Sequence, residues 1–260
     1  MSMRVIGWDE AVEGGTGRGV VPAAATIGVF DGLHVGHMAL VSRVAAMAPA
    51  LVPTVVTFRG NPKRLTAPHR PTGALFSLEQ KLETLEAAGV ATVVLIDFSG
   101  NFSKLAGKDF LSILVRSCGV RSFVVGSDFK CGHRLSTDSA ALVEIALSLG
   151  ASAEVVDPVM LDGQAVSSSR IRTAIDAGRM DLALAMLGRP YALDLRGAEM
   201  ESSGGLLRVS PRGRDTVLPK PGAYPARADG RPVTATVHRD GSLDWPDDGA
   251  GFPRFLSFGS

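Results

Sequence analysis

The sequence is poor in cysteine: its 260 residues include only Cys118 and Cys131. Two cysteines cannot form the disulfide framework of a small extracellular protein, so we expect two reduced thiols in a cytoplasmic protein. Uninterrupted apolar runs of about 18 residues are also missing, and the first residues lack the apolar core of a signal peptide. We therefore expect neither a membrane span nor a secretory leader.

A surplus of charge of one sign is absent as well. Lys and Arg number 27 and Asp and Glu 26, which leaves a net charge of +1. This balance gives no electrostatic reason to expect nucleic acid or an anionic membrane as a partner. With 45% hydrophobic and 20% charged residues, the composition is that of an ordinary globular protein.

Short apolar runs alternate with amphipathic segments over the first 190 residues. Alternating strands and helices of this length form right-handed βαβ units, so the sequence predicts an α/β fold with a doubly wound parallel sheet. Ligands of such sheets bind outside the carboxyl ends of the strands. The predicted strands are 26–30, 54–58, 93–96, 122–126 and 153–156. The predicted helices are 36–47, one between the Ser77/Gln80 capping box and Gly89, 104–117, 139–149, 169–177 and 182–187.

The pattern changes near residue 190. Seven of the 15 prolines lie in the last 70 residues, where polar and apolar residues alternate with period two between turns. Segments 206–209, 232–238 and 255–258 predict short strands of a small antiparallel β unit. We therefore expect two domains, 1–191 and 192–260.

The most informative segment, G-V-F-D-G-L-H-V-G-H, runs from Gly28 to His37 between a predicted strand and a predicted helix. The N-terminus of a helix carries free N–H groups and a partial positive charge, which suit phosphate. His34 and His37 can donate hydrogen bonds to phosphate oxygens from a solvated cleft as charge develops there. The alternatives are two surface histidines at a helix start, or a partial metal site.

Two further segments follow predicted strands or begin predicted helices. In V-S-S-S-R-I-R (166–172), the serines can cap a helix and form a second phosphate cradle, with Arg172 forking onto the phosphate. An ordinary N-cap with a solvated arginine is the alternative. In G-S-D-F-K-C-G (126–132), Asp128 can accept a ligand's hydrogen bond, hold Mg²⁺ or only cap a turn, and Phe129 can be a core residue.

Together these segments resemble a known family. G-x-F-D-G-x-H-x-G-H is similar to the H-x-G-H signature of nucleotidyltransferases, in the form found in the FMN adenylyltransferase module of bacterial riboflavin kinase/FAD synthetases. The 126–132 and 166–172 segments and L-G-R-P-Y (187–191) resemble that family's other motifs in order and spacing. The resemblance spans about residues 20–191.

The resemblance implies a Rossmann-like domain that converts ATP and FMN into FAD and pyrophosphate with Mg²⁺. It implies His34, His37 and Arg172 as catalytic residues, and Asp128 as a possible Mg²⁺ ligand. The implied flavin site includes Asn61, Pro62, Asp128 and Phe129. The implied ATP site comprises Gly28, Val29, Phe30, Asp31, Gly36, His37, Ser168, Ser169 and Arg172.

The sequence departs from the family pattern at several places. Asn61 stands where the family has histidine, Cys131 replaces an aromatic residue, and Thr137 replaces a glycine. The kinase motif P-T-A-N has no counterpart in 192–260, although L-P-K-P-G-A-Y (218–224) resembles a strand of the kinase barrel. We therefore expect a truncated, non-catalytic kinase barrel; an unrelated β module is the alternative.

Three other functions remain open. The first is the same chemistry with another acceptor, such as phosphopantetheine or a small phosphate ester with CTP. The second is a protein that is still both kinase and adenylyltransferase. The third is a flavin- or nucleotide-binding protein without turnover.

Overall fold

The computed structural model describes residues 2–13, 21–60, 73–98, 102–213 and 215–259. The chain divides into two compact units. Unit 1 comprises Met1–Phe30, Gly36–Pro68 and Leu82–Met160, and unit 2 comprises Asp31–Val35, His69–Lys81 and Leu161–Ser260.

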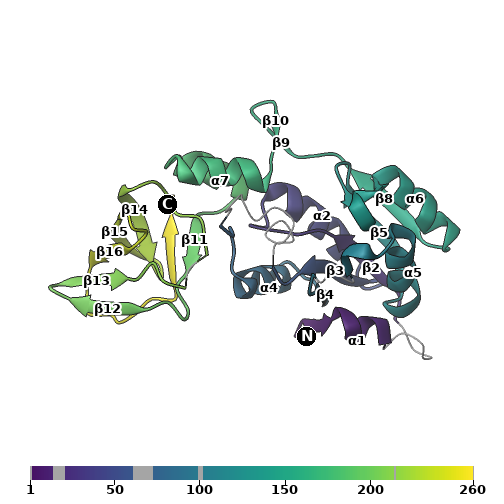
Figure 1. The fold of residues 1–260 in the computed structure, drawn as a ribbon, viewed down its shortest axis with the longest axis horizontal. Helices are drawn as coiled ribbons and strands as arrows, with labels where there is room; N and C mark the ends of the chain where they lie inside the picture. The colour runs from purple at the N-terminus through teal and green to yellow at the C-terminus, as the bar shows by residue number, and fades with distance from the viewer. Residues whose placement is uncertain (1, 14–20, 61–72, 99–101, 214, 260) are drawn as a thin grey trace. The chain divides into compact units, whose positions relative to one another are not determined.

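Unit 1 is built on a six-stranded parallel sheet (Figure 1) with the strand order β1-β4-β3-β2-β5-β8. Its central strands are buried apolar runs, as expected of strands covered on both faces. The predicted doubly wound parallel sheet is thereby confirmed. Its strands are β1 (Arg4–Gly7), β2 (Ala23–Ile27), β3 (Val52–Phe58), β4 (Thr92–Ile96), β5 (Val120–Gly126) and β8 (Ser152–Val156).

Helices cover both faces of this sheet. On one face, α1 (Trp8–Glu13), α5 (Gly107–Ser117) and α6 (Ser139–Ser148) enclose a core that includes Phe110 and Phe123. On the other face, Val44 of α2 (Val35–Ala45) packs on Ala24 of β2 and Val124 of β5. Because neighbouring strand residues point to opposite faces, one apolar run serves both layers.

Helix α4 (Leu78–Ala87) begins at the predicted capping box. The Gln80 N–H donates to the Ser77 hydroxyl at 3.0 Å, and the Ser77 N–H donates to Oε1 of Gln80 at 3.0 Å. Two N–H groups that would otherwise lack partners are thus satisfied where the helix starts.

Unit 2 contains a seven-stranded antiparallel sheet with the order β11-β17-β14-β15-β16-β13-β12, which confirms the predicted antiparallel unit. Two predicted strands, 206–209 and 255–258, match β13 and β17. The helices of unit 2 are α7 (Ser168–Asp176) and α8 (Met180–Leu187). Its strands are β11 (Tyr191–Asp194), β12 (Met200–Ser203), β13 (Leu206–Val209), β14 (Gly222–Ala228), β15 (Arg231–Val237), β16 (Leu243–Pro246) and β17 (Phe255–Phe258).

Short elements complete both units. Strands β6 (Lys130–Cys131) and β7 (Thr137–Asp138) form a small hairpin after β5. Strands β9 (Met160–Leu161) and β10 (Gln164–Ala165) pair before α7. Single turns of 3₁₀ helix are η2 (Phe102–Lys104) and η3 (His133–Leu135).

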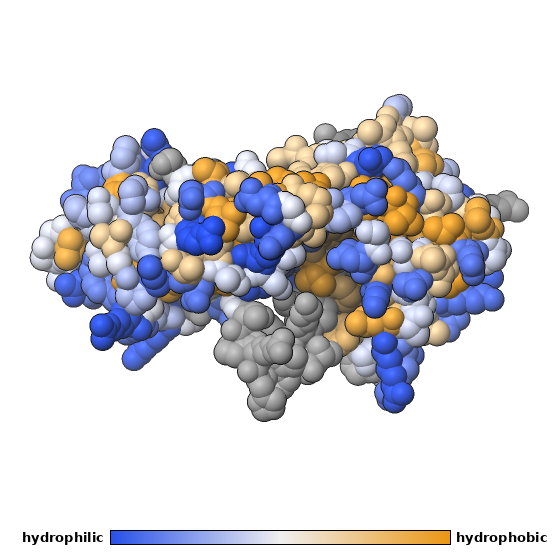
Figure 2. Space-filling model, turned by 90° about the horizontal axis from the view of Figure 1, so that it is seen from above, coloured by the Kyte–Doolittle hydropathy of each residue, from blue (hydrophilic) through white to orange (hydrophobic). Residues whose placement is uncertain are grey.

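The face of the molecule seen in Figure 2 mixes apolar and polar residues. Figure 2 shows its hydrophobic residues in separate groups between hydrophilic ones. Within the described parts of the chain, we find no helix with the length and hydropathy needed to span a membrane.

Thr137, one of the departures from the family pattern, lies against a glycine. A Cβ on Gly107 would lie 2.1 Å from Oγ1 of Thr137, and a Cβ on Gly132 would lie 2.6 Å from the Gly107 nitrogen. Asp138 beside it caps α6, because its Oδ1 accepts from the Ala141 N–H at 3.0 Å. The threonine is therefore accommodated by the missing side chain at residue 107.

This contact predicts a compensating pair of substitutions. Gly107→Ala should lower the free energy of unfolding by about 1–3 kcal/mol through overpacking, and Thr137→Gly in the same chain should restore part of that loss. Urea denaturation measures both effects. Gly7→Ala is the matched control, since no atom lies within 4 Å of its added methyl. A Gly107→Ala variant as stable as the parent would contradict the contact.

Candidate active site

The strand order of unit 1 reverses beside β2. Strands β3 and β4 lie on one side of β2, and β5 and β8 lie on the other. In open α/β sheets, ligands bind at such a switch point, outside the carboxyl ends of the strands. Thr26 of β2 pairs with Val124 of β5, so the segments that begin at Gly28 and Gly126 leave the sheet side by side. The parallel register thus brings two predicted motifs together.

Phe30 organises the first of these segments. Its buried ring meets the His37 ring edge-on, with centroids 5.2 Å apart and planes at 80°. A Cβ on Gly28 would lie 3.1 Å from that ring, so a larger residue there would have to displace the Phe30 ring slightly. Thr57 donates to the Val29 carbonyl at 3.1 Å. Gly36 and His37 lie in the first turn of α2.

The loop after Phe30 has an unusual backbone. Phe30 and Leu33 have φ of +49° and +37°, and Gly32 has +82°. A positive φ angle is uncommon for residues other than glycine, and it persists only where surrounding contacts enforce it. Residues with such angles cluster at functional sites. A Cβ on Gly32 would lie 2.8 Å from Leu75, which explains the glycine.

Arg189, within the L-G-R-P-Y motif, fixes this loop conformation in unit 2. Its guanidinium donates to the carbonyl of Gly32 at 2.6 Å and to that of Leu33 at 3.0 Å. It also lies over the Phe76 ring, 4.6 Å from the centroid.

Asp31 joins three segments of unit 2. Its Oδ1 accepts from the Leu75 N–H at 2.9 Å, its Oδ2 accepts from Nη2 of Arg172, and its carbonyl accepts from the Ser168 hydroxyl at 2.9 Å. Arg172 also donates from Nε to the Gly73 carbonyl at 2.9 Å. The Asp31 and Arg172 side chains are only 9% and 13% exposed. Arg172 is therefore not the solvated arginine of the alternative interpretation.

The serines before Arg172 have separate roles. Ser167 is the N-cap of α7 and accepts from the Arg170 N–H at 3.3 Å, whereas Ser168 binds Asp31. Ser169 lies in the first turn of the helix. The capping that the sequence predicted is thus confirmed for Ser167.

Lys81, which the sequence analysis missed, is buried, and the negative charge of Asp31 acts on its pKa. Burial lowers the Lys81 pKa from 10.5 to about 8, and the charge of Asp31 opposes that shift. Its position three residues after Leu78, on the apolar stripe of α4, was the available signal. With Arg172 and Arg189, it gives this part of unit 2 more positive than negative charge around Asp31.

His34 is buried, only 5% exposed. Burial, and then the charge of Arg189, lower its pKa from 6.5 to about 4, so the imidazole is neutral at pH 7. The expectation of a solvated histidine is therefore wrong for His34, because packing of the loop encloses the ring. A neutral imidazole still provides one N–H donor.

The residues predicted for the flavin site come from segments of the sequence other than those that surround Asp31. Asp128 is exposed in the turn after β5, and Phe129 is half-buried against the core of unit 1. Asn61 and Pro62 lie outside the described residues. Cys131 also packs on that core, and burial raises its thiol pKa to about 12. The thiol is therefore unreactive at neutral pH.

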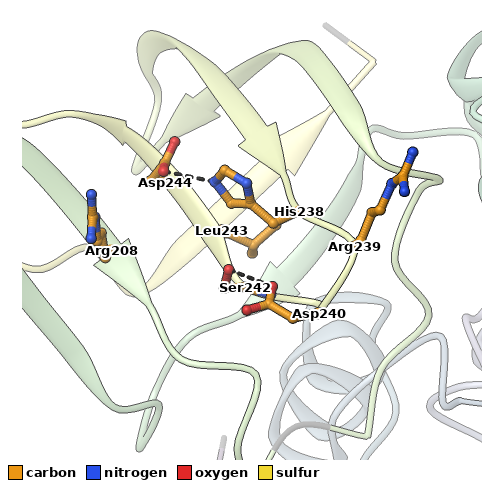
Figure 3. Close-up of a pocket in the computed structure, with 7 residues that line it drawn as sticks. All are labelled: Arg208, His238, Arg239, Asp240, Ser242, Leu243 and Asp244. Carbon is orange, nitrogen blue, oxygen red and sulfur yellow. Dashed lines mark hydrogen bonds and ion pairs between the residues drawn. The ribbon is translucent and has the colours of Figure 1, made fainter.

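A surface cavity of about 510 Å³ lies elsewhere, beside the turn between β15 and β16. Figure 3 shows two interactions among its lining residues: His238 binds Asp244 at 2.7 Å, and the Ser242 hydroxyl donates to Asp240 at 2.6 Å. No predicted site residue is part of its described lining, so we do not place the site there.

The parallel sheet and the loop at its switch point place the chain among the α/β proteins that carry an H-x-G-H motif. The family model for FAD synthetase matches residues 20–170, more than half of the chain, and the chain belongs to this family. The match includes the loop at the switch point and ends at Arg170, the third residue of α7.

Curated relatives agree with this assignment. The chain is 36% identical over 172 residues to a bifunctional riboflavin kinase/FMN adenylyltransferase of Pseudomonas fluorescens, covering 65% of this chain and 55% of that protein. It is 30% identical over 205 residues to the protein of the same name from Escherichia coli K12, covering 76% and 66%. The chain thus spans between about half and two thirds of the length of these relatives.

A solved structure has the same fold along nearly the whole chain. The crystal structure of a macrolide-efflux protein from Streptococcus pneumoniae matches with a TM-score of 0.82 and 21% identity, covering 98% of this chain and 89% of that one. At this identity, the likeness concerns the fold alone. It includes the antiparallel sheet after Tyr191.

Buried His34 predicts an acid-sensitive fold. The unfolded state takes up a proton near pH 6.5, whereas the folded state resists it down to about pH 4. Stability contributed by neutral His34 is therefore complete above pH 6.5 and falls by up to about 3 kcal/mol towards pH 4. In the His34→Gln variant, the free energy of unfolding should fall less between pH 7.5 and pH 4.5 than it does in the parent, as measured by urea denaturation. Exposed His133→Gln is the control, and equal acid sensitivity of His34→Gln and the parent would contradict the analysis.

Buried Lys81 predicts a stability that rises at alkaline pH. Below about pH 8, Lys81 is charged in both states, and its burial destabilises the fold. This cost disappears as the pH rises from 8 to 10.5, where only the unfolded state keeps the proton. Lys81→Met should raise the free energy of unfolding at pH 7 by roughly 1–3 kcal/mol, as measured by urea denaturation. Exposed Lys104→Met is the control, and a destabilised Lys81→Met variant would argue against this reasoning.

Proposed function

We propose that the protein is an FMN adenylyltransferase, which forms FAD and pyrophosphate from ATP and FMN. The observation that carries this proposal is the G-x-F-D-G-x-H-x-G-H loop at the switch point, within the residues matched to FAD synthetase. Surplus positive charge around Asp31 supports binding of a triphosphate chain. We also propose that the enzyme is cytoplasmic.

The reaction needs positioning and charge stabilisation more than covalent chemistry. A phosphate oxygen of FMN attacks the α-phosphorus of ATP in line, and the bond to the bridging oxygen breaks to release pyrophosphate. Neutral His34 donates a hydrogen bond to the phosphates, and His37 acts from the first turn of α2. Their contacts strengthen as negative charge develops on the phosphate oxygens.

Arg172 is the proposed partner of the outer ATP phosphates, together with Ser168 and Ser169. Its Nε and Nη2 are engaged by Gly73 and Asp31, while Nη1 makes no hydrogen bond to the described residues. Gly73 and Asp31 therefore fix the position of the guanidinium group, while its Nη1 remains a hydrogen-bond donor for phosphate oxygens.

Mg²⁺ enters this proposal as the ion that accompanies ATP. The described residues hold no cluster of three His, Cys, Asp or Glu side chains suited to a metal. Mg²⁺ commonly uses one or two carboxylates together with substrate phosphates, and the exposed Asp128 fits that role. When bound, Mg²⁺ neutralises phosphate charge. Asn61, Pro62 and Phe129 are the proposed flavin-side residues.

We propose 1–191 as the adenylyltransferase domain and 192–260 as a β domain without kinase activity. What supports the second assignment is the lack of a P-T-A-N segment in these residues, which in the family helps to hold Mg²⁺ and nucleotide.

The test is FAD synthesis by the purified chain, with flavins separated by chromatography. FMN, ATP and Mg²⁺ should give FAD, and His37→Ala should lower kcat by about 10²–10³. Exposed His133→Ala, on η3, is the matched control. Flavin binding without FAD formation would favour a protein without turnover, and FMN formed from riboflavin at a comparable rate would restore the bifunctional alternative.

A further inference from the structure

Segment 73–77 lies between the candidate site and the residues that follow Tyr191, all within unit 2. On the site side, the Gly73 carbonyl accepts from Arg172, and the Leu75 N–H donates to Asp31. Gly73 and Leu75 therefore fix both partners of the buried Asp31–Arg172 ion pair.

On its other side, the segment pairs with backbone from the C-terminal part of the chain. The Ala74 N–H donates to the Asp215 carbonyl at 2.7 Å, and the Val217 N–H donates to the Ala74 carbonyl at 3.1 Å. Ala74 and Thr216 form a parallel β-bridge. Residues 215–217 thus hold residue 74 through its N–H and its carbonyl, with the two site contacts one residue away on either side.

Further hydrogen bonds hold the end of the segment. The Ser77 hydroxyl donates to Oδ2 of Asp194 at 2.6 Å, and Nε2 of Gln80 donates to the Ala192 carbonyl at 2.9 Å. Burial opposes the charge of Asp194, yet hydrogen bonds from Arg196 and Ser77 keep its pKa below the usual value. Asp194 is therefore a charged, fixed anchor at neutral pH.

We propose that residues 192–194 and 215–217 position Arg172 for ATP by fixing segment 73–77. This inference rests on the proposed function, in which Arg172 binds ATP phosphates. The β domain then has a role in the adenylyltransferase reaction that requires no kinase activity. Gly73, Asp194 and Thr216 are positioning residues, because they act through the arginine.

Gly73 offers a sharp way to disturb this arrangement. A Cβ there would lie 2.8 Å from the Val217 nitrogen and 2.9 Å from the carbonyl carbon of Thr216. Gly73→Ala therefore pushes segment 73–77 and residues 215–217 apart. It leaves the carbonyl that binds Arg172 chemically unchanged and lies on neither substrate in the proposal.

The experiment measures ATP and FMN dissociation constants by calorimetry, beside FAD synthesis, for full-length variants. Gly73→Ala should raise the Kd for ATP by about tenfold, as expected for a displaced charge-assisted contact, and leave the Kd for FMN within about twofold. Gly7→Ala, with open space around the added methyl, is the control. ATP affinity unchanged in Gly73→Ala, or equal losses for both ligands, would overturn the inference.

A double-mutant cycle separates positioning from general damage. If Gly73→Ala acts through Arg172, it should add less than about twofold to the ATP Kd of Arg172→Lys, because coupled substitutions are not additive. Fully additive losses would refute the inference. Should Gly73→Ala not fold, Ser77→Ala replaces it in the cycle and Ser77→Thr, which keeps the hydroxyl, should restore affinity. A parent chain that binds ATP without forming FAD overturns the proposed function alone, and one that does not bind ATP overturns both.

Discussion

The buried carboxylate of Asp31 is the constraint on which the site depends. A charge removed from water is tolerated only with a partner of opposite charge and hydrogen bonds to its oxygens. Arg172 and the Leu75 N–H provide both. Because these partners come from α7 and from segment 73–77, satisfying one carboxylate brings three distant stretches of unit 2 together. The loop that carries His34 is held at its first residue by this convergence.

The same cluster explains why the site costs stability. Lys81 and His34 both have lowered pKa values through burial, and the charge of Arg189 acts on His34 as well. Lys81 is buried while charged at pH 7 and therefore opposes folding, whereas His34 is neutral there and lowers stability only as the pH falls. In the proposed function, the positive charge of Lys81, Arg172 and Arg189 is in place before a phosphate arrives and needs no reorganisation. Sites of this kind commonly trade stability for function. Here the trade follows from burying more positive than negative charge around Asp31.

Sequence patterns predicted the parallel sheet well, because buried strands are apolar runs. The first predicted strand, 26–30, nevertheless ends three residues too late, since β2 stops at Ile27 and Phe30 turns into the positive-φ loop. The sequence analysis predicted no strand at β1, β11, β12 or β16, and its 218–224 segment reaches only the first three residues of β14. Pro225 in β14 and Pro246 in β16 weaken the strand signal. The site motifs could be recognised in the sequence because each is one contiguous segment. The Asp31–Arg172 pair could not, because 141 residues separate its members.

The β unit after Tyr191 has a physical reason to be present even without a kinase motif. Its residues satisfy the N–H and carbonyl of Ala74 and the hydroxyl of Tyr191, which donates to the Val217 carbonyl at 2.7 Å from a fully buried ring. A buried polar group left without a partner costs about 1–3 kcal/mol. Removing the β unit would therefore leave the N–H and carbonyl of Ala74 without these hydrogen-bond partners. The residues on either side of Ala74, which contact Asp31 and Arg172, would lose that support. In this chain, the β unit is part of the hydrogen-bond network that supports Asp31 and Arg172.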